Sequence, residues 1–123
     1  MWVFGNPDLP ADALPLKLLP KLKKHFPKTK FLVLDPLDEW LIPDELLIID
    51  TVEGIDRVRV FTSLEAFSQF RRVTMHDFDL GLQLEFLKKL GKLPRFVIFG
   101  LPPKLSEKEA FDQLTISFGQ YGV

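Results

Sequence analysis

The sequence contains no cysteine. This absence excludes disulfides, a thiol nucleophile and any zinc site built on cysteine ligands. No apolar run approaches the ~18 consecutive residues of a membrane-spanning helix, and we expect no signal peptide at the start of the chain. We therefore expect a cytoplasmic protein that does not insert into a membrane.

Several catalytic and nucleotide-binding motifs are also missing. There is no Gly-x-Ser-x-Gly elbow, no glycine-rich dinucleotide or phosphate loop, and no His-Glu-x-x-His zinc helix. The serines have no recognisable base partner. Any catalysis must therefore come from carboxylates, a histidine and a metal ion.

The chain also lacks a surplus of positive charge. Its 16 lysines and arginines and 17 aspartates and glutamates give a net charge of −1. A nucleic-acid partner is not expected, because binding phosphates needs an excess of basic residues. A local cluster of lysines is best interpreted as a solvated helix face. Its members are Lys21, Lys23, Lys24, Lys28 and Lys30.

What the chain does contain is enough apolar material for a core. It has 123 residues, of which 46% are hydrophobic, and no linker or repeat divides it. We expect a single domain over residues 1–123. Continuous apolar runs indicate strands covered by helices on both faces. These runs are residues 2–4, 31–34, 45–49 and 96–99. Residues 57–61 alternate polar with apolar, which indicates an antiparallel edge strand.

Helical patterns fill the intervals between these runs. Leucines at four-residue spacing predict a helix from about residue 14 to 26, and a second stripe predicts one over residues 79–90. Ser106 and Glu109 form a capping box that opens a last helix ending near Gly119. Strands that alternate with helices predict an α/β three-layer sandwich. Its central sheet should have about five largely parallel strands, one antiparallel edge strand, and helices on both faces.

Polar residues follow the predicted strands at positions where ligands bind in such sheets. Asn6, Asp35 and Asp50 each follow a strand, and each also suits an ordinary turn. Asp12 can be either the N-cap of the first helix or a ligand. His76 precedes a helix, where it can be a surface residue or a ligand whose ring Asp77 orients.

Taken in order, these residues resemble the nickel–iron hydrogenase maturation endopeptidases, from Phe4 to about Pro103. Gly5-Asn6 with an acidic residue six positions later looks like the family's opening loop. Residues 47–52 look like its central strand ending in an aspartate. Residues 74–81, Thr-Met-His-Asp-Phe-Asp-Leu-Gly, look like its histidine segment and are the most specific match.

The resemblance implies both a site and a function. An acidic residue, an aspartate and a histidine bind metal and serve catalysis in that family, and they correspond here to Asp12, Asp50 and His76. Asn6, Asp35 and Asp77 would be supporting residues. The family usually has glutamate at the first position, so Asp12 is one methylene shorter. The implied activity removes a C-terminal peptide from the hydrogenase large-subunit precursor after nickel insertion.

The implied cofactor is nickel carried by the precursor, with zinc or cadmium as substitutes in vitro. Imidazole and carboxylate ligands suit such divalent ions. The precursor is the expected partner, and a monomer is the expected state. Two alternatives remain open: a metal- or precursor-binding chaperone that does not cut, and a small zinc-dependent hydrolase. Whether the metal polarises the carbonyl or activates water also remains open.

Overall fold

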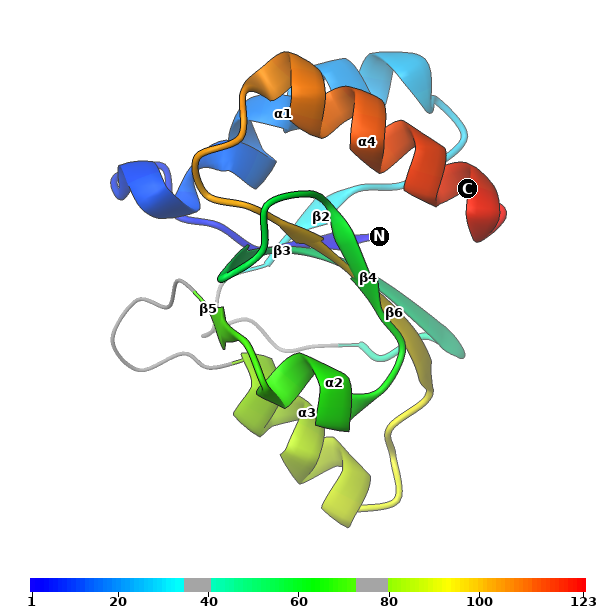
Figure 1. The fold of residues 1–123 in the computed structure, drawn as a ribbon. Coiled ribbons are helices and arrows are strands. Elements are labelled where there is room, and N and C mark those ends of the chain that lie inside the picture. Colours follow the sequence, from blue (N-terminus) through cyan, green and yellow to red (C-terminus); the bar gives the residue numbers. More distant parts are fainter. Residues whose placement is uncertain (35–40, 73–79) are drawn as a thin grey trace.

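The structure is a computed structural model that describes residues 1–34, 41–72 and 80–123. Its sheet has the strand order β2-β1-β3-β6-β4, and a short strand, β5, also pairs with β3. Figure 1 shows helices on both faces of this sheet. The strands are β1 (Trp2–Val3), β2 (Leu32–Val33), β3 (Glu45–Glu53), β4 (Arg59–Phe61), β5 (Arg71–Arg72) and β6 (Arg95–Leu101).

The strand directions confirm the predicted sheet. The β1–β2, β1–β3 and β3–β6 pairs are parallel, and β4 pairs antiparallel with β6 at one edge. The longest parallel pairing runs from Glu45 opposite Arg95 to Thr51 opposite Leu101. The five strands of this path, with helices on both sides, form the α/β sandwich expected from the sequence.

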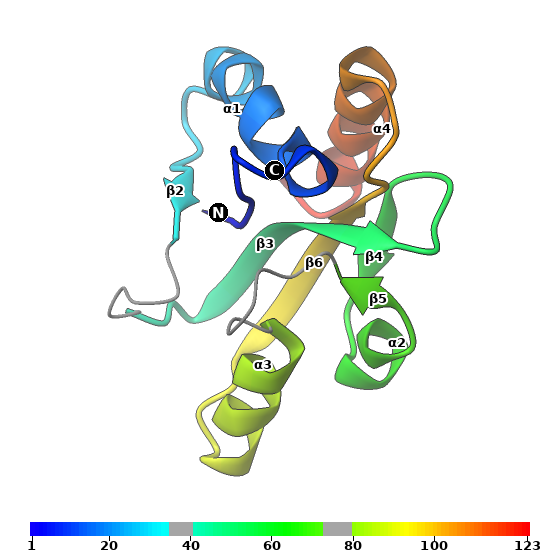
Figure 2. The same cartoon turned by 90° about the vertical axis from the view of Figure 1, so that its left-hand side faces the viewer.

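Two pairs of helices make the outer layers. Helices α1 (Leu14–His25) and α4 (Glu107–Gln120) lie together on one face, and α2 (Leu64–Ser68) and α3 (Leu80–Lys89) lie on the other (Figures 1 and 2). Ser106 caps α4, because its hydroxyl accepts a hydrogen bond from the Glu109 amide at 3.2 Å, as the capping box predicts. No helix in the described ranges is long and apolar enough to cross a membrane.

Each face of β3 contributes to a separate core. Ile48 and Val52 pack in the cluster beneath α2 and α3, whereas Ile49 packs in the cluster beneath α1 and α4. This split follows from the alternation of side chains along a strand. The same alternation places Asp50 on the α2–α3 face and Thr51 on the α1–α4 face.

The structure corrects some local expectations. β3 does not end at Ile49 but continues through Asp50 to Glu53. β2 is an exposed edge strand, not one covered on both faces. Leu90, the last residue of the helix predicted over residues 79–90, follows α3 and is 51% exposed. The short elements α2, β5 and the 3-10 turn η1 (Pro10–Asp12) were not predicted.

Candidate functional site

Asp12 is held in place by the loop that follows β1. Its backbone carbonyl accepts a hydrogen bond from the Asn6 amide at 2.9 Å, and its own amide donates to the Leu9 carbonyl at 2.8 Å. Gly5 permits this close approach, because a Cβ at that position would lie 2.9 Å from the Asp12 carbonyl oxygen. The opening loop therefore folds back and presents Asp12 beside the end of β1.

Asp12 does not cap the first helix. Ala13 is the N-cap of α1, and Asp12 belongs to the preceding turn η1. The Asp12 side chain is only 6% exposed, and its Oδ1 atom has no hydrogen-bond partner among the described residues. Helix capping therefore does not explain this aspartate. A buried oxygen without a partner is costly and calls for another explanation.

Burial also changes the acidity of Asp12. Desolvation raises its pKa from 3.8 to about 6, and the nearby Thr51 side chain opposes part of that rise. The nearness of Thr51 does not amount to a hydrogen bond of normal geometry, because Thr51 Oγ1 also has no partner in the described part of the chain. A bound cation would favour the charged carboxylate and so relieve the cost of its burial.

Asp50 is rigidly placed inside β3. It pairs with Gly100 of β6, is 6% exposed, and its Oδ1 accepts a hydrogen bond from the Thr51 amide at 2.9 Å. Along β3, β1 makes contact up to Ile49, whose carbonyl accepts from the Phe4 amide, and β5 makes contact from Val52 onward. Asp50 and Thr51 therefore lie between these two contacts.

At this position the strand order reverses, because the strands that follow β1 in the chain are added on opposite sides of it. From β1 the chain passes to α1 and then to β2 on one side, whereas β3 lies on the other side of β1 (Figure 2). In open α/β sheets, ligands bind beyond the carboxyl ends of the strands at such a point. Asp12 and Asp50 come from the two segments that flank it.

An open cavity of about 660 Å³ lies at the same end of the sheet. Three segments line it: Pro10 and Ala11 of η1, residues 53–55 at the end of β3, and residues 102–104 after β6. Asp12 directly follows the first of these segments, and Thr51 and Asp50 precede the second. Asp12, Asp50 and Thr51 are not themselves among the residues that line the cavity.

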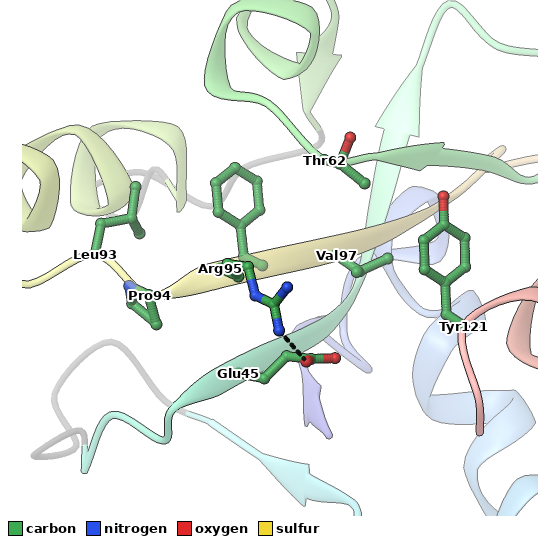
Figure 3. Close-up of a pocket in the computed structure, with 8 residues that line it drawn as sticks. Glu45, Thr62, Leu93, Pro94, Arg95, Val97 and Tyr121 are labelled. Atoms are coloured by element: carbon green, nitrogen blue, oxygen red, sulfur yellow. Dashed lines mark ion pairs between the residues drawn. The ribbon is translucent and has the colours of Figure 1, made fainter.

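A second cavity, of about 460 Å³, lies at the opposite end of β3 and β6. Figure 3 shows its side chains, among them the ion pair in which Arg95 Nη2 and Glu45 Oε2 are 3.7 Å apart. The Arg95 side chain is 91% exposed and that of Glu45 50%, so solvent screens their attraction. This cavity is at the amino ends of the parallel strands and away from Asp50.

The other predicted site residues divide into two groups. Asn6 is described and acts within its loop, where Oδ1 accepts a hydrogen bond from the Asp8 amide at 2.9 Å. His76, Asp35 and Asp77 lie outside the described residues. No group of three potential metal ligands occurs within residues 1–34, 41–72 and 80–123, so the described part contributes Asp12 and Asp50 alone to the predicted trio.

The chain's other histidine has a structural role. His25 Nδ1 lies 3.0 Å from the Lys21 carbonyl oxygen, and the ring packs edge-on against Phe111 with centroids 5.0 Å apart. These contacts tie the end of α1 to α4.

Thr51 is the residue that sequence reasoning missed. It is fully buried, and its unpartnered hydroxyl is close to Asp12. The available signal was a hydroxyl residue directly after an aspartate in an otherwise apolar strand. We interpreted that pair as the end of the strand, whereas both residues belong to it.

No protein-family model, curated protein or solved structure matches the chain.

Proposed function

We propose that the chain is a cytoplasmic maturation endopeptidase. It removes the C-terminal peptide from the large-subunit precursor of a nickel–iron hydrogenase after nickel has been inserted. Asp12, Asp50 and His76 bind the nickel that the precursor carries, and that nickel supplies a Lewis acid next to the bond that is cut. The proposal begins from the order of these residues in the sequence.

The burial of two carboxylates at the sheet's switch point carries the proposal. Asp12 and Asp50 are each 6% exposed, and Asp12 Oδ1 has no partner within the described chain. Asp50 Oδ1 already accepts a hydrogen bond from the Thr51 amide. For Asp12, a cation would offset the loss of hydration that burial brings. Carboxylate oxygens also suit a borderline divalent ion such as nickel. The residues therefore fit the metal that the resemblance implies.

The length of chain around His76 is compatible with its role as the third ligand. Arg72 of β5 pairs with Val52, two residues after Asp50, and α3 begins at Leu80. Four residues extend at most about 14 Å. The link from Arg72 to His76 is therefore long enough for an imidazole to reach Asp50. His76 itself enters the proposal through its sequence motif alone.

The cavity lined by Pro10 and Ala11 of η1 suits an extended peptide. Prolines 10, 102 and 103 and Ile55 give it apolar walls, and Glu53 and Lys104 give it one charge of each sign. Proline has no amide hydrogen, so these walls offer a peptide mainly apolar contact. In the proposal, the precursor's C-terminal segment lies here while its nickel reaches Asp12 and Asp50.

Incubation of the protein with nickel-loaded and nickel-free precursor tests this function. Release of the C-terminal peptide is followed by mass spectrometry. We expect release from the nickel-loaded form only, and a loss of at least about tenfold in rate for His76→Ala. His25→Ala is the matched control, because it removes the other histidine and should retain the wild-type rate.

The same assay separates the alternatives. A chaperone would bind the precursor and release no peptide. A small-molecule hydrolase would do neither, and would instead act on ester or amide probes when loaded with zinc. Equal cleavage of both precursor forms, or an unchanged rate for His76→Ala, would contradict the mechanism.

A further inference from the structure

The environment of Thr51 is unusual for a threonine in a strand. Its side chain is fully buried, yet Oγ1 has no hydrogen-bond partner in the described ranges. A strand position facing a core normally favours an apolar β-branched residue such as valine. A buried hydroxyl without a partner destabilises the fold by comparison, so stability alone does not account for threonine here.

Asp12 is the polar group that faces this hydroxyl. The two side chains are close enough for Thr51 to affect the carboxyl, and Asp12 Oδ1 also lacks a partner. The alternation along β3 places Thr51 on the α1–α4 face, the side on which the η1 turn leads into α1.

We propose that Thr51 is a positioning residue for metal binding: its hydroxyl donates a hydrogen bond to Asp12 Oδ1 and so directs the second carboxylate oxygen, Oδ2, toward the ion. This inference rests on the proposed function only in taking Asp12 as a metal ligand. Donors of this kind orient metal-binding carboxylates and hold them in one rotamer.

A bound ion would strengthen the proposed hydrogen bond between Thr51 and Asp12. With metal, the carboxylate is charged and held on one side by the ion, which favours a short, charge-assisted hydrogen bond from the hydroxyl on the other. The threonine thus acts through Asp12 and does not touch the ion.

Three variants of the full chain test this role. Thr51→Val removes the hydroxyl and keeps the shape, Thr51→Ser keeps the hydroxyl, and Thr115→Val removes a hydroxyl from α4, where it donates to the Phe111 carbonyl. The affinity for Zn²⁺ alone is measured by isothermal titration calorimetry. Stability of the metal-free chain is measured in parallel by urea unfolding.

We expect Thr51→Val to weaken zinc affinity by about 10- to 100-fold. Its metal-free stability should stay equal to that of the wild type or rise, because an apolar side chain replaces an unpaired hydroxyl. Thr51→Ser should bind zinc within about threefold of the wild type, and Thr115→Val should not change the affinity. A merely structural threonine would instead lower stability and affinity together.

The inference is overturned if Thr51→Val binds zinc as the wild type does, or if Thr51→Ser loses as much affinity as Thr51→Val. It is also overturned if the wild type binds no zinc. None of these results decides the function, which the precursor cleavage assay tests separately. A protein that fails to cleave but shows the Thr51 dependence would retain the metal site and lose the proposed activity.

Discussion

The carboxyl of Asp12 lies close enough to the hydroxyl of Thr51 for that hydroxyl to lower its pKa, yet Asp12 Oδ1 and Thr51 Oγ1 each lack a hydrogen-bond partner among the described residues. Both side chains are buried at the point where β1 ends and β3 continues. Two buried oxygens without hydrogen-bond partners reduce stability. We propose that binding of a metal ion at this site explains the two unpaired oxygens.

Asp12 should make stability depend on pH. Its folded-state pKa of about 6 lies above the usual 3.8, so the folded chain keeps a proton that the unfolded chain has released between those values. Stability from this group is therefore present below about pH 4 and is lost as the pH rises through about 6. Asp12→Asn, which cannot ionise, should be more stable than the wild type at pH 8 by about 1–2 kcal/mol, after allowance for solvent screening.

Urea unfolding at pH 4 and pH 8 measures this difference. At pH 4 the variant and the wild type should be nearly equal in stability, because both side chains are then neutral. Asp8→Asn is the control, since Asp8 is exposed in the same loop and should show no such trend. A stability difference for Asp12→Asn that is the same at both pH values would contradict the burial of an ionisable group.

Gly5→Ala should disturb the opening loop. The added Cβ would lie 2.9 Å from the Asp12 carbonyl oxygen and 3.3 Å from Leu16 Cγ. Because the first neighbour is backbone, we expect a loss of about 1–3 kcal/mol in unfolding free energy. Gly119→Ala is the control. A Cβ added at Gly119 would meet nothing within 4 Å. Gly119 lies in the last turn of α4, where alanine should be neutral or stabilise the fold by ~0.5 kcal/mol.

Thermal or urea unfolding of both glycine variants gives the comparison, with zinc affinity as a second measurement. Gly5→Ala should also weaken zinc binding, because the loop that holds Asp12 must move. Equal stability of the two alanine variants would show that the close approach at Gly5 does not constrain the loop.

The core beneath α4 should depend on Phe118. This side chain is fully buried, and its ring packs edge-on against Phe99 and Phe26 with centroids 4.9 and 5.3 Å away. Phe118→Ala should lower the free energy of unfolding by about 3–5 kcal/mol, because it leaves a cavity among these rings. Ile116→Ala, at a position 67% exposed on the same helix, should change it by less than about 0.5 kcal/mol. Comparable losses for the two variants would contradict this packing.

Features that depend on local sequence were predicted well. The Ser106 cap, the leucine stripe of α1 and the alternating pattern before Phe61 all produced the expected elements. Each is encoded within one or two turns of chain, so the pattern alone is sufficient. The exposure of β2 is different, because it follows from its place at the edge of the sheet and not from its own apolar residues.

The predictions for the candidate site also divide into those that depend on local sequence and those that depend on distant pairing. Asp12 and Asp50 were identified from their spacing and family order, and the structure buries both. The continuation of β3 through Asp50 and Thr51 was missed, because polar residues after an apolar run usually indicate a turn. Pairing with β6 up to Leu101 keeps these residues in the strand. That pairing joins residues about fifty positions apart, so the local sequence did not reveal it.

The most direct test of the central claim is the position of an anomalous zinc peak in crystals soaked with zinc. The account predicts one ion bound by a carboxylate oxygen of Asp12, a carboxylate oxygen of Asp50 and a ring nitrogen of His76, each at about 2.0–2.2 Å. Crystals of His76→Ala grown and soaked in the same way should lose the peak or show it much weakened, and those of His25→Ala should keep it. A peak held by other side chains, or no peak within coordinating distance of Asp12 and Asp50, would contradict the account.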